Sequence, residues 1–136
     1  MKLRRRDLVL LPWLGAVLLR AQDASSARGR LSGELRLKLA DGRLVALSGD
    51  AESTAVLRDE RLARDEFELR GRFTAPDAFA IDPIYKRAIF VWRDGRKLVV
   101  TYWCAVCSIR AWTPGKCQCC QDEMAVDPRD PALKDT

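Results

Sequence analysis

The 136-residue chain contains no histidine. Histidine is the side chain whose ordinary pKa lies nearest neutrality, and it is the commonest general base in enzymes. Its absence excludes serine–histidine and cysteine–histidine catalytic pairs, and it excludes the histidine-rich open zinc sites of most hydrolases. The sequence also contains no phosphate-binding glycine loop and no dinucleotide-binding motif. We therefore predict a protein without enzymatic activity.

Long apolar runs are also missing. The longest, residues 8–19, has twelve residues, whereas a membrane-spanning helix needs about twenty. A basic segment precedes this run and small residues follow it as far as Ala27, which is the order of a secretory signal. Arg5-Arg6 also resembles a twin-arginine signal. We predict that residues 1–27 are a cleaved export signal, with an uncleaved anchor as the alternative, and that the mature protein is periplasmic or secreted without a stable membrane anchor.

Charge gives little support for a nucleic-acid partner. Residues 1–27 contain five Lys or Arg and two acids, so their removal lowers the net charge from +5 to +2. Binding of single strands requires exposed aromatic residues in a basic groove. The basic residues of the middle of the chain, among them Arg70, Lys86 and Arg87, are interleaved with acids, which indicates a solvated face of mixed charge. We predict no nucleic-acid partner, and the sequence identifies no other partner.

The five cysteines all lie within seventeen positions near the C-terminus. Four of them form two C-x2-C pairs that are separated by nine residues. Two such pairs on short turns can bring four thiolates onto one tetrahedral ion, and a four-cysteine cage is the usual closed structural zinc site. The pattern therefore predicts a zinc site formed by Cys104, Cys107, Cys117 and Cys120. Cys119 is a possible substitute for one ligand of the second pair, or a spare thiol.

Residues 102–124 resemble the short zinc-ribbon and heavy-metal-binding modules. The resemblance rests on an aromatic pair before Cys104-x2-Cys107, followed by Pro114-Gly115-Lys116-Cys117-x2-Cys120. It implies a bound divalent metal, zinc, on the same four cysteines. The chain has Cys107 where heavy-metal modules commonly have His, and 121–123 where Gly-Met would follow. These departures favour a closed structural site over one that transfers its metal to a partner.

Three other uses of the cysteines stay open. An exported protein meets an oxidising compartment, so the cysteines would also suit a disulfide-stapled binding module. Cys104 and Cys107 would suit a thiol–disulfide redox protein, because a C-x-x-C motif can lower a thiol pKa. An iron–sulfur cluster uses the same four thiolates as zinc. Twin-arginine export carries folded proteins, so a metal site could load in the reducing cytoplasm, and this favours zinc.

The strongest periodicity in the rest of the chain is that of β-strands. Residues 35–39 and 44–47 alternate around a turn sequence and predict a hairpin. Residues 66–74 predict a strand with Phe67, Leu69 and Phe73 in the core and Glu68 in water. Residues 88–92 and 98–103 flank Asp94-Gly95, which favours a tight hairpin turn. A short strand at 78–81 is also predicted. Residues 52–63 predict either a helix without a good cap or a loop and short strand.

These elements predict an all-β, β-rich fold, either a small OB-like barrel or a sandwich. The order of elements over residues 30–92 is similar to that of an OB-like barrel, which often binds oligonucleotides. We expect one domain over 28–126, with a Cys-rich knuckle at 102–124 at its C-terminal end. Two prolines and several charges predict a disordered tail over 127–136.

Overall fold

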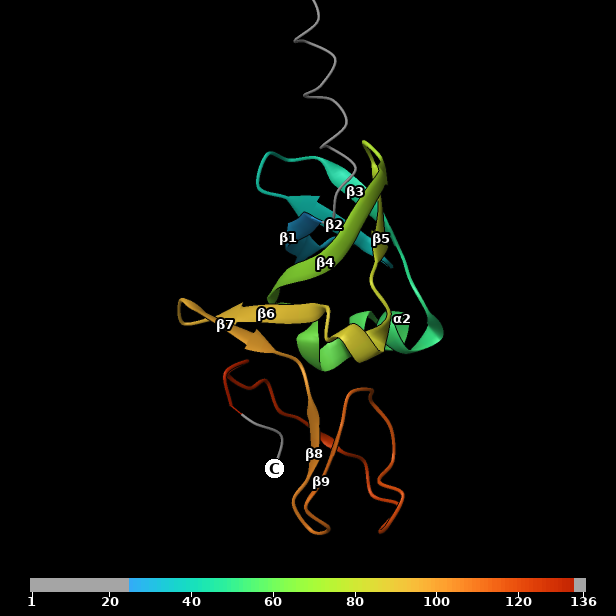
Figure 1. The fold of residues 1–136 in the computed structure, drawn as a ribbon, viewed down its shortest axis with the longest axis vertical. Helices are drawn as coiled ribbons and strands as arrows, with labels where there is room; N and C mark the ends of the chain where they lie inside the picture. The colour runs from blue at the N-terminus through green and yellow to red at the C-terminus, as the bar shows by residue number, and fades with distance from the viewer. Residues whose placement is uncertain (1–24, 134–136) are drawn as a thin grey trace, which may run out of the picture.

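The structure is a computed structural model that describes residues 25–133. Its upper part in Figure 1 is a closed five-stranded barrel, which confirms the all-β, OB-like fold class. The barrel strands follow the order β1-β2-β3-β5-β4, and β4 also pairs with β1 to close the ring. Only the β3–β5 pair is parallel among these pairings. The strands are β1 (Ser25–Leu31), β2 (Arg36–Leu39), β3 (Leu44–Ser48), β4 (Glu66–Ala75) and β5 (Ala78–Ile81).

Strand β1 is an element that the sequence analysis missed. Its residues show no clear apolar alternation, but Ala27 is buried and pairs with Leu69 of β4. The predicted export signal at 1–27 lies outside the described residues as far as residue 24. Residues 25–27 form the start of β1, so a cleavage that preserves the whole strand falls before Ser25. Within residues 25–133, no helix has the length and apolar character needed to cross a membrane.

Strand β4 holds the barrel together, because it pairs with β1, β5 and β6 along its length. Phe67 and Leu69 are fully buried, and the ring of Phe73 lies 4.9 Å from that of Phe79 in an edge-to-face arrangement. Gly71 occupies the position where the neighbouring strand comes closest. A Cβ atom there would lie 2.0 Å from the carbonyl oxygen of Ala80, so only glycine fits without a shift of the backbone.

The helical link between β3 and β4 is shorter and better capped than its sequence predicts. Helix α2 (Ala51–Leu57) ends six residues before the predicted limit, and a 3-10 helix, η3 (Glu60–Leu62), follows it. The Asp50 carboxylate accepts a hydrogen bond from the Ser53 amide at 2.8 Å and caps α2. Asp59 caps η3 in the same way through the amide of Arg61. The expectation of an uncapped helix was therefore wrong.

A second hairpin lies against the outside of the barrel. It consists of β6 (Ile89–Arg93) and β7 (Arg96–Val99), with Asp94 and Gly95 both at positive φ in its turn, as the Asp-Gly sequence predicts. A short 3-10 helix, η4 (Ile84–Lys86), precedes it. Strand β6 pairs with the edge of β4 in the same sheet, and there Glu68 accepts hydrogen bonds from the Lys97 ammonium and the Trp92 ring nitrogen. Glu68 is thus a paired and half-buried residue, and the prediction that it faces water was wrong.

The lower part of Figure 1 is a separate three-stranded sheet of order β10-β8-β9. It consists of β8 (Tyr102–Cys104), β9 (Ile109–Ala111) and β10 (Ala125–Val126). The single strand predicted over 98–103 is therefore divided between β7 and β8, which belong to different sheets. The segment predicted to be disordered from residue 127 is hydrogen-bonded to the rest of the fold through Asp127 N to Thr101 O at 2.7 Å and a bridge between Arg129 and Val99.

The burial of Phe67 gives a direct test of the register of β4. Phe67→Ala should lower the free energy of unfolding by about 3–5 kcal/mol, because it removes a fully buried aromatic side chain from the barrel core. Arg72→Ala, on the exposed face of the same strand, should change it by less than about 0.5 kcal/mol. Urea unfolding at neutral pH measures both values. Equal losses from the two substitutions would contradict this register.

Candidate metal centre

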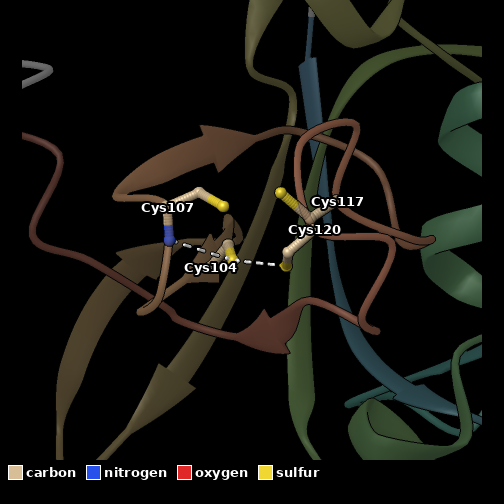
Figure 2. Close-up of side chains that lie close together, drawn as sticks. All are labelled: Cys104, Cys107, Cys117 and Cys120. Carbon is tan, nitrogen blue, oxygen red and sulfur yellow. Dashed lines mark hydrogen bonds between the residues drawn. The ribbon is translucent and has the colours of Figure 1, made fainter.

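Four cysteine side chains meet below the small sheet. Cys104 is the last residue of β8 and Cys107 lies in the turn to β9, whereas Cys117 and Cys120 come from the loop between β9 and β10. Their sulfur atoms all lie within 4.8 Å of one another. Figure 2 shows these sulfur atoms turned toward one another. The structure thus brings together the four cysteines that the spacing selects.

The first C-x-x-C turn wraps its backbone around one sulfur atom. The amide of Cys107 points at the Sγ atom of Cys104, with a nitrogen–sulfur distance of 3.5 Å. Ser108, the residue after the pair, has a φ of +54°. This left-handed conformation turns the chain back into β9 at once, so that the pair sits on a tight knuckle.

The second C-x-x-C turn also directs an amide at its first sulfur, although from the residue two positions later and not three. The amide of Cys119 points at the Sγ atom of Cys117 at 3.4 Å, and Gln121, the residue after the pair, has a φ of +67°. The base of this turn is closed by two backbone hydrogen bonds, Gln121 N to Cys117 O at 2.9 Å and Cys117 N to Asp122 O at 2.8 Å. Two knuckles of the same local design therefore face each other across the four sulfur atoms.

The five cysteines differ in how deeply they are buried. Cys117 is fully buried and Cys104 nearly so, and both belong to the core together with Tyr102 and Met124. Cys107 and Cys120 are half-buried, whereas Cys119 is exposed and is not one of the four whose sulfurs converge. The geometry of the site therefore does not require Cys119. It lies within the second knuckle, where its backbone amide points at the Sγ atom of Cys117 and its side chain neighbours that of Cys107.

The thiols of the cluster differ in acidity. The backbone amides of Cys120 and Cys119 lower the pKa of Cys117 to about 7. The neighbouring side chain of Cys119, burial and the other cysteines raise the pKa of Cys107 well above its usual range. Because crowded thiols oppose one another's ionisation, all four become thiolates near neutral pH only when a cation offsets their charge.

The donor set fits a single metal ion. Four zinc–sulfur bonds of about 2.3 Å in a tetrahedron place the sulfurs about 3.8 Å apart. The Sγ atoms of Cys104 and Cys120 lie 3.6 Å apart, and no sulfur pair of the four exceeds 4.8 Å. All five cysteines of the chain are among the described residues and none forms a disulfide, whose sulfurs would be about 2.05 Å apart. Four sulfur donors without a nitrogen or oxygen ligand suit zinc or another thiophilic metal.

A polar clamp joins this site to the barrel. The Tyr102 hydroxyl, at the start of β8, donates a hydrogen bond of 2.9 Å to the Asp59 carboxylate, which also accepts from both Nε and Nη2 of Arg61. Arg61 Nη1 then donates to the carbonyl oxygen of Met124 at 2.8 Å. Asp59 thus binds Tyr102 of β8, just before the first knuckle, and Arg61 binds Met124, which follows the second knuckle. Sequence analysis did not find this clamp, because its residues are separated by about forty positions or more.

Burial by itself raises the pKa of Asp59, but the hydrogen bonds from Arg61 and Tyr102 outweigh it. The net pKa therefore lies below the ordinary value of 3.8. Burial and the Asp59 carboxylate raise the pKa of Tyr102 far above its usual range. Tyr102 consequently stays a hydroxyl donor and Asp59 an acceptor over the whole neutral range.

No family model, curated protein or solved structure matches the chain. The resemblance of residues 102–124 to zinc-ribbon and heavy-metal-binding modules is therefore not supported by a family assignment. What supports a metal site is the convergence of the four sulfur atoms.

We expect the Asp59 carboxylate of the clamp to contribute strongly to the free energy of unfolding. Asp59→Ala should lower the free energy of unfolding by about 2–4 kcal/mol, because it leaves the buried Tyr102 hydroxyl and Arg61 without their partner. The loss should shrink as the pH falls below about 4, since a carboxylate with a lowered pKa contributes stability above its ordinary pKa and loses it on protonation. Urea unfolding of wild type and variant from pH 3 to 7 measures this difference.

Asp41→Ala is the matched control, because Asp41 forms an exposed ion pair with Arg43 on the barrel surface. Such a pair contributes little, about 0–1 kcal/mol. Similar losses in the two variants, or a loss in Asp59→Ala that does not depend on pH, would contradict the proposed role of the clamp.

Proposed function

We propose that this protein is an exported, non-enzymatic zinc-binding protein whose four-cysteine site is structural. The observation that carries the proposal is the convergence of Cys104, Cys107, Cys117 and Cys120 from two knuckles of the same design. Each knuckle directs a backbone amide at one of the sulfurs, which is the arrangement that stabilises thiolate ligands. Four sulfurs converge, which is the number of ligands in a closed structural site.

Zinc is favoured over an iron–sulfur cluster by the spacing of the sulfurs. A cluster of several irons spreads its cysteine ligands over the corners of a cage, whereas a single ion holds four sulfurs about 3.8 Å apart. The 4.8 Å limit on every sulfur–sulfur distance agrees with one ion. Two of the ligands are deeply buried, so exchange of the metal with a partner protein would require the knuckles to open.

A structural role is favoured by the small size of the sheet that carries the site. Its strands have three, three and two residues, and such short strands are not stable by themselves in water. A metal that binds only the folded state adds its binding free energy to folding. The ion would thus fix the two loops that connect these strands, 105–108 and 112–124.

Export is supported by the charged, apolar and small-residue order of the leader. A twin-arginine route would let the site load with zinc in the reducing cytoplasm before the folded protein leaves. Thiol–disulfide exchange is the second candidate. It is favoured by the 3.6 Å separation of the Cys104 and Cys120 sulfurs and by the lowered pKa of Cys117.

Metal content tests the proposal directly. The full chain, with its leader processed, should contain about one zinc per molecule after purification without reductant, as measured by elemental analysis. Removal of zinc by a chelator should unfold the small sheet, because the metal contributes on the order of 10 kcal/mol in comparable sites. The thermal midpoint should fall, and reactive thiols should increase from one, Cys119, to five. A metal-free protein of unchanged stability would exclude the structural role.

Single substitutions separate the ligands from the spare thiol. Cys119→Ser should keep the full zinc content, because its sulfur is exposed and not part of the converging set. We expect a loss of zinc affinity of about 100-fold or more from each ligand substitution, because loss of a mere outer-shell partner already costs roughly 10–100-fold. These substitutions are Cys104→Ser, Cys107→Ser, Cys117→Ser and Cys120→Ser. Thiol-exchange activity that disappears in Cys104→Ser or Cys120→Ser, in a protein without zinc, would favour the redox function instead.

A further inference from the structure

A pocket of about 220 Å³ lies between the barrel and the small sheet. Its wall combines segments that are far apart in the sequence: β4, η4, β6, β9 and the chain after β10. None of the cysteines lines it, so it is distinct from the metal centre. Its charged lining residues are Arg70, Lys86, Arg87, Arg110, Arg129 and Asp130.

Positive charge predominates in this pocket. Five of the lining residues are basic and one is acidic, and Asp130 also lies 3.7 Å from Arg96 outside the pocket. The ratio of basic to acidic residues is far higher in the pocket than in the whole chain, because folding brings together cations from four separate segments. A concave wall of one charge sign concentrates its field on the enclosed space, which attracts ligands of the opposite sign. The cations are mostly arginines, whose planar guanidinium groups match the geometry of carboxylate and phosphate oxygens.

Arg110 is held in place as a fixed cation. Its Nη1 atom donates to the Thr101 hydroxyl at 2.7 Å and to the Asp127 carboxylate at 2.8 Å, and its guanidinium lies 4.6 Å from the centre of the Trp103 ring. Its Nε atom is buried and has no hydrogen-bond partner within the protein. Unsatisfied buried donors are rare. Asp127 offsets the guanidinium charge, so the Nε atom adds an N–H donor without an acceptor, not an unpaired charge.

The same pocket has a flat apolar side. Trp112 and Phe90 line it, and the Arg87 guanidinium lies 4.4 Å from the centre of the Trp112 ring. Arg87 has a left-handed backbone, with a φ of +55°, at the end of η4. A planar group attached to an anion could therefore lie against aromatic carbon while its charged end meets the arginines.

We propose that this pocket binds a small organic anion through its carboxylate or phosphate group, with a planar apolar part against Trp112. A nucleic acid fits the observations less well. OB-like barrels bind oligonucleotides on the face of β2 and β3 and on the loops that follow β1 and β4, and no residue of β2, β3 or those loops lines the pocket. The enclosed volume also suits a small molecule rather than a strand.

Titration of the zinc-loaded full chain with benzoate and with phenyl phosphate tests the proposal by calorimetry. At low ionic strength at least one of the two should bind with a dissociation constant of about 1 mM or lower, as small ligands of this size permit. Binding should weaken as salt is added. Benzyl alcohol, of similar shape but neutral, should not bind. The relative affinities of the two anions distinguish a preference for carboxylate from one for phosphate.

Lys86→Gln and Arg129→Gln should each weaken binding by about tenfold, the effect of losing one charge-assisted contact. Arg36→Gln, which removes an exposed cation from β2, should leave it unchanged. Unchanged zinc content and thermal midpoint will show that the variants are folded.

Lack of saturable binding by both anions would overturn the proposal. So would equal weakening in the Arg36→Gln control, or binding of a single-stranded oligonucleotide without binding of either small anion.

Discussion

The crowding of four thiols within 4.8 Å is the constraint on which the lower half of the molecule depends. Thiols this close oppose one another's ionisation, so the arrangement is favourable with all four ionised only around a cation. The strands beside them are too short to hold the loops by backbone hydrogen bonds alone. A bound ion would supply a direct connection between the two loops that carry the cysteines.

The two knuckles meet the same geometric requirement. Each must place two cysteines three residues apart on one side of a turn, and each ends on a left-handed residue, Ser108 or Gln121. Neither is a glycine, although glycine adopts this conformation without strain. The surrounding hydrogen bonds, among them Cys117 N to Asp122 O, hold Gln121 in place. The backbone conformation around the sulfurs is therefore set by these hydrogen bonds and not by the intrinsic preference of the residues for a conformation.

The barrel and the small sheet are joined on two sides by different chemistry. On one side, Asp59 and Arg61 bind Tyr102 and the backbone of Met124, which flank the cysteine cluster. On the other side, Arg110 binds Thr101 and Asp127 and forms part of the basic pocket. The pocket has walls from both halves, so its shape depends on how the small sheet packs against the barrel. A structural ion and a ligand pocket would then be coupled through β8 and β9.

Sequence alone was sufficient for features that depend on near neighbours. The alternation of residues 66–74 predicts β4, Asp94-Gly95 predicts the hairpin turn, and the two C-x2-C pairs select the four cysteines that converge. These patterns succeed because side-chain direction in a strand and the reach of a short turn are set within a few residues.

The tertiary structure decided what depends on distant partners. Strand β1 exists because β2 and β4 flank it. Glu68 is half-buried because Trp92 and Lys97 of the neighbouring β6–β7 hairpin bind it, and Arg129 is anchored because Val99 lies beside it. The basic pocket arises in the same way, since its arginines are interleaved with acids along the chain and come together only in space. Sequence determines which groups are available and how each short segment bends, but packing between remote segments determines which of those groups meet.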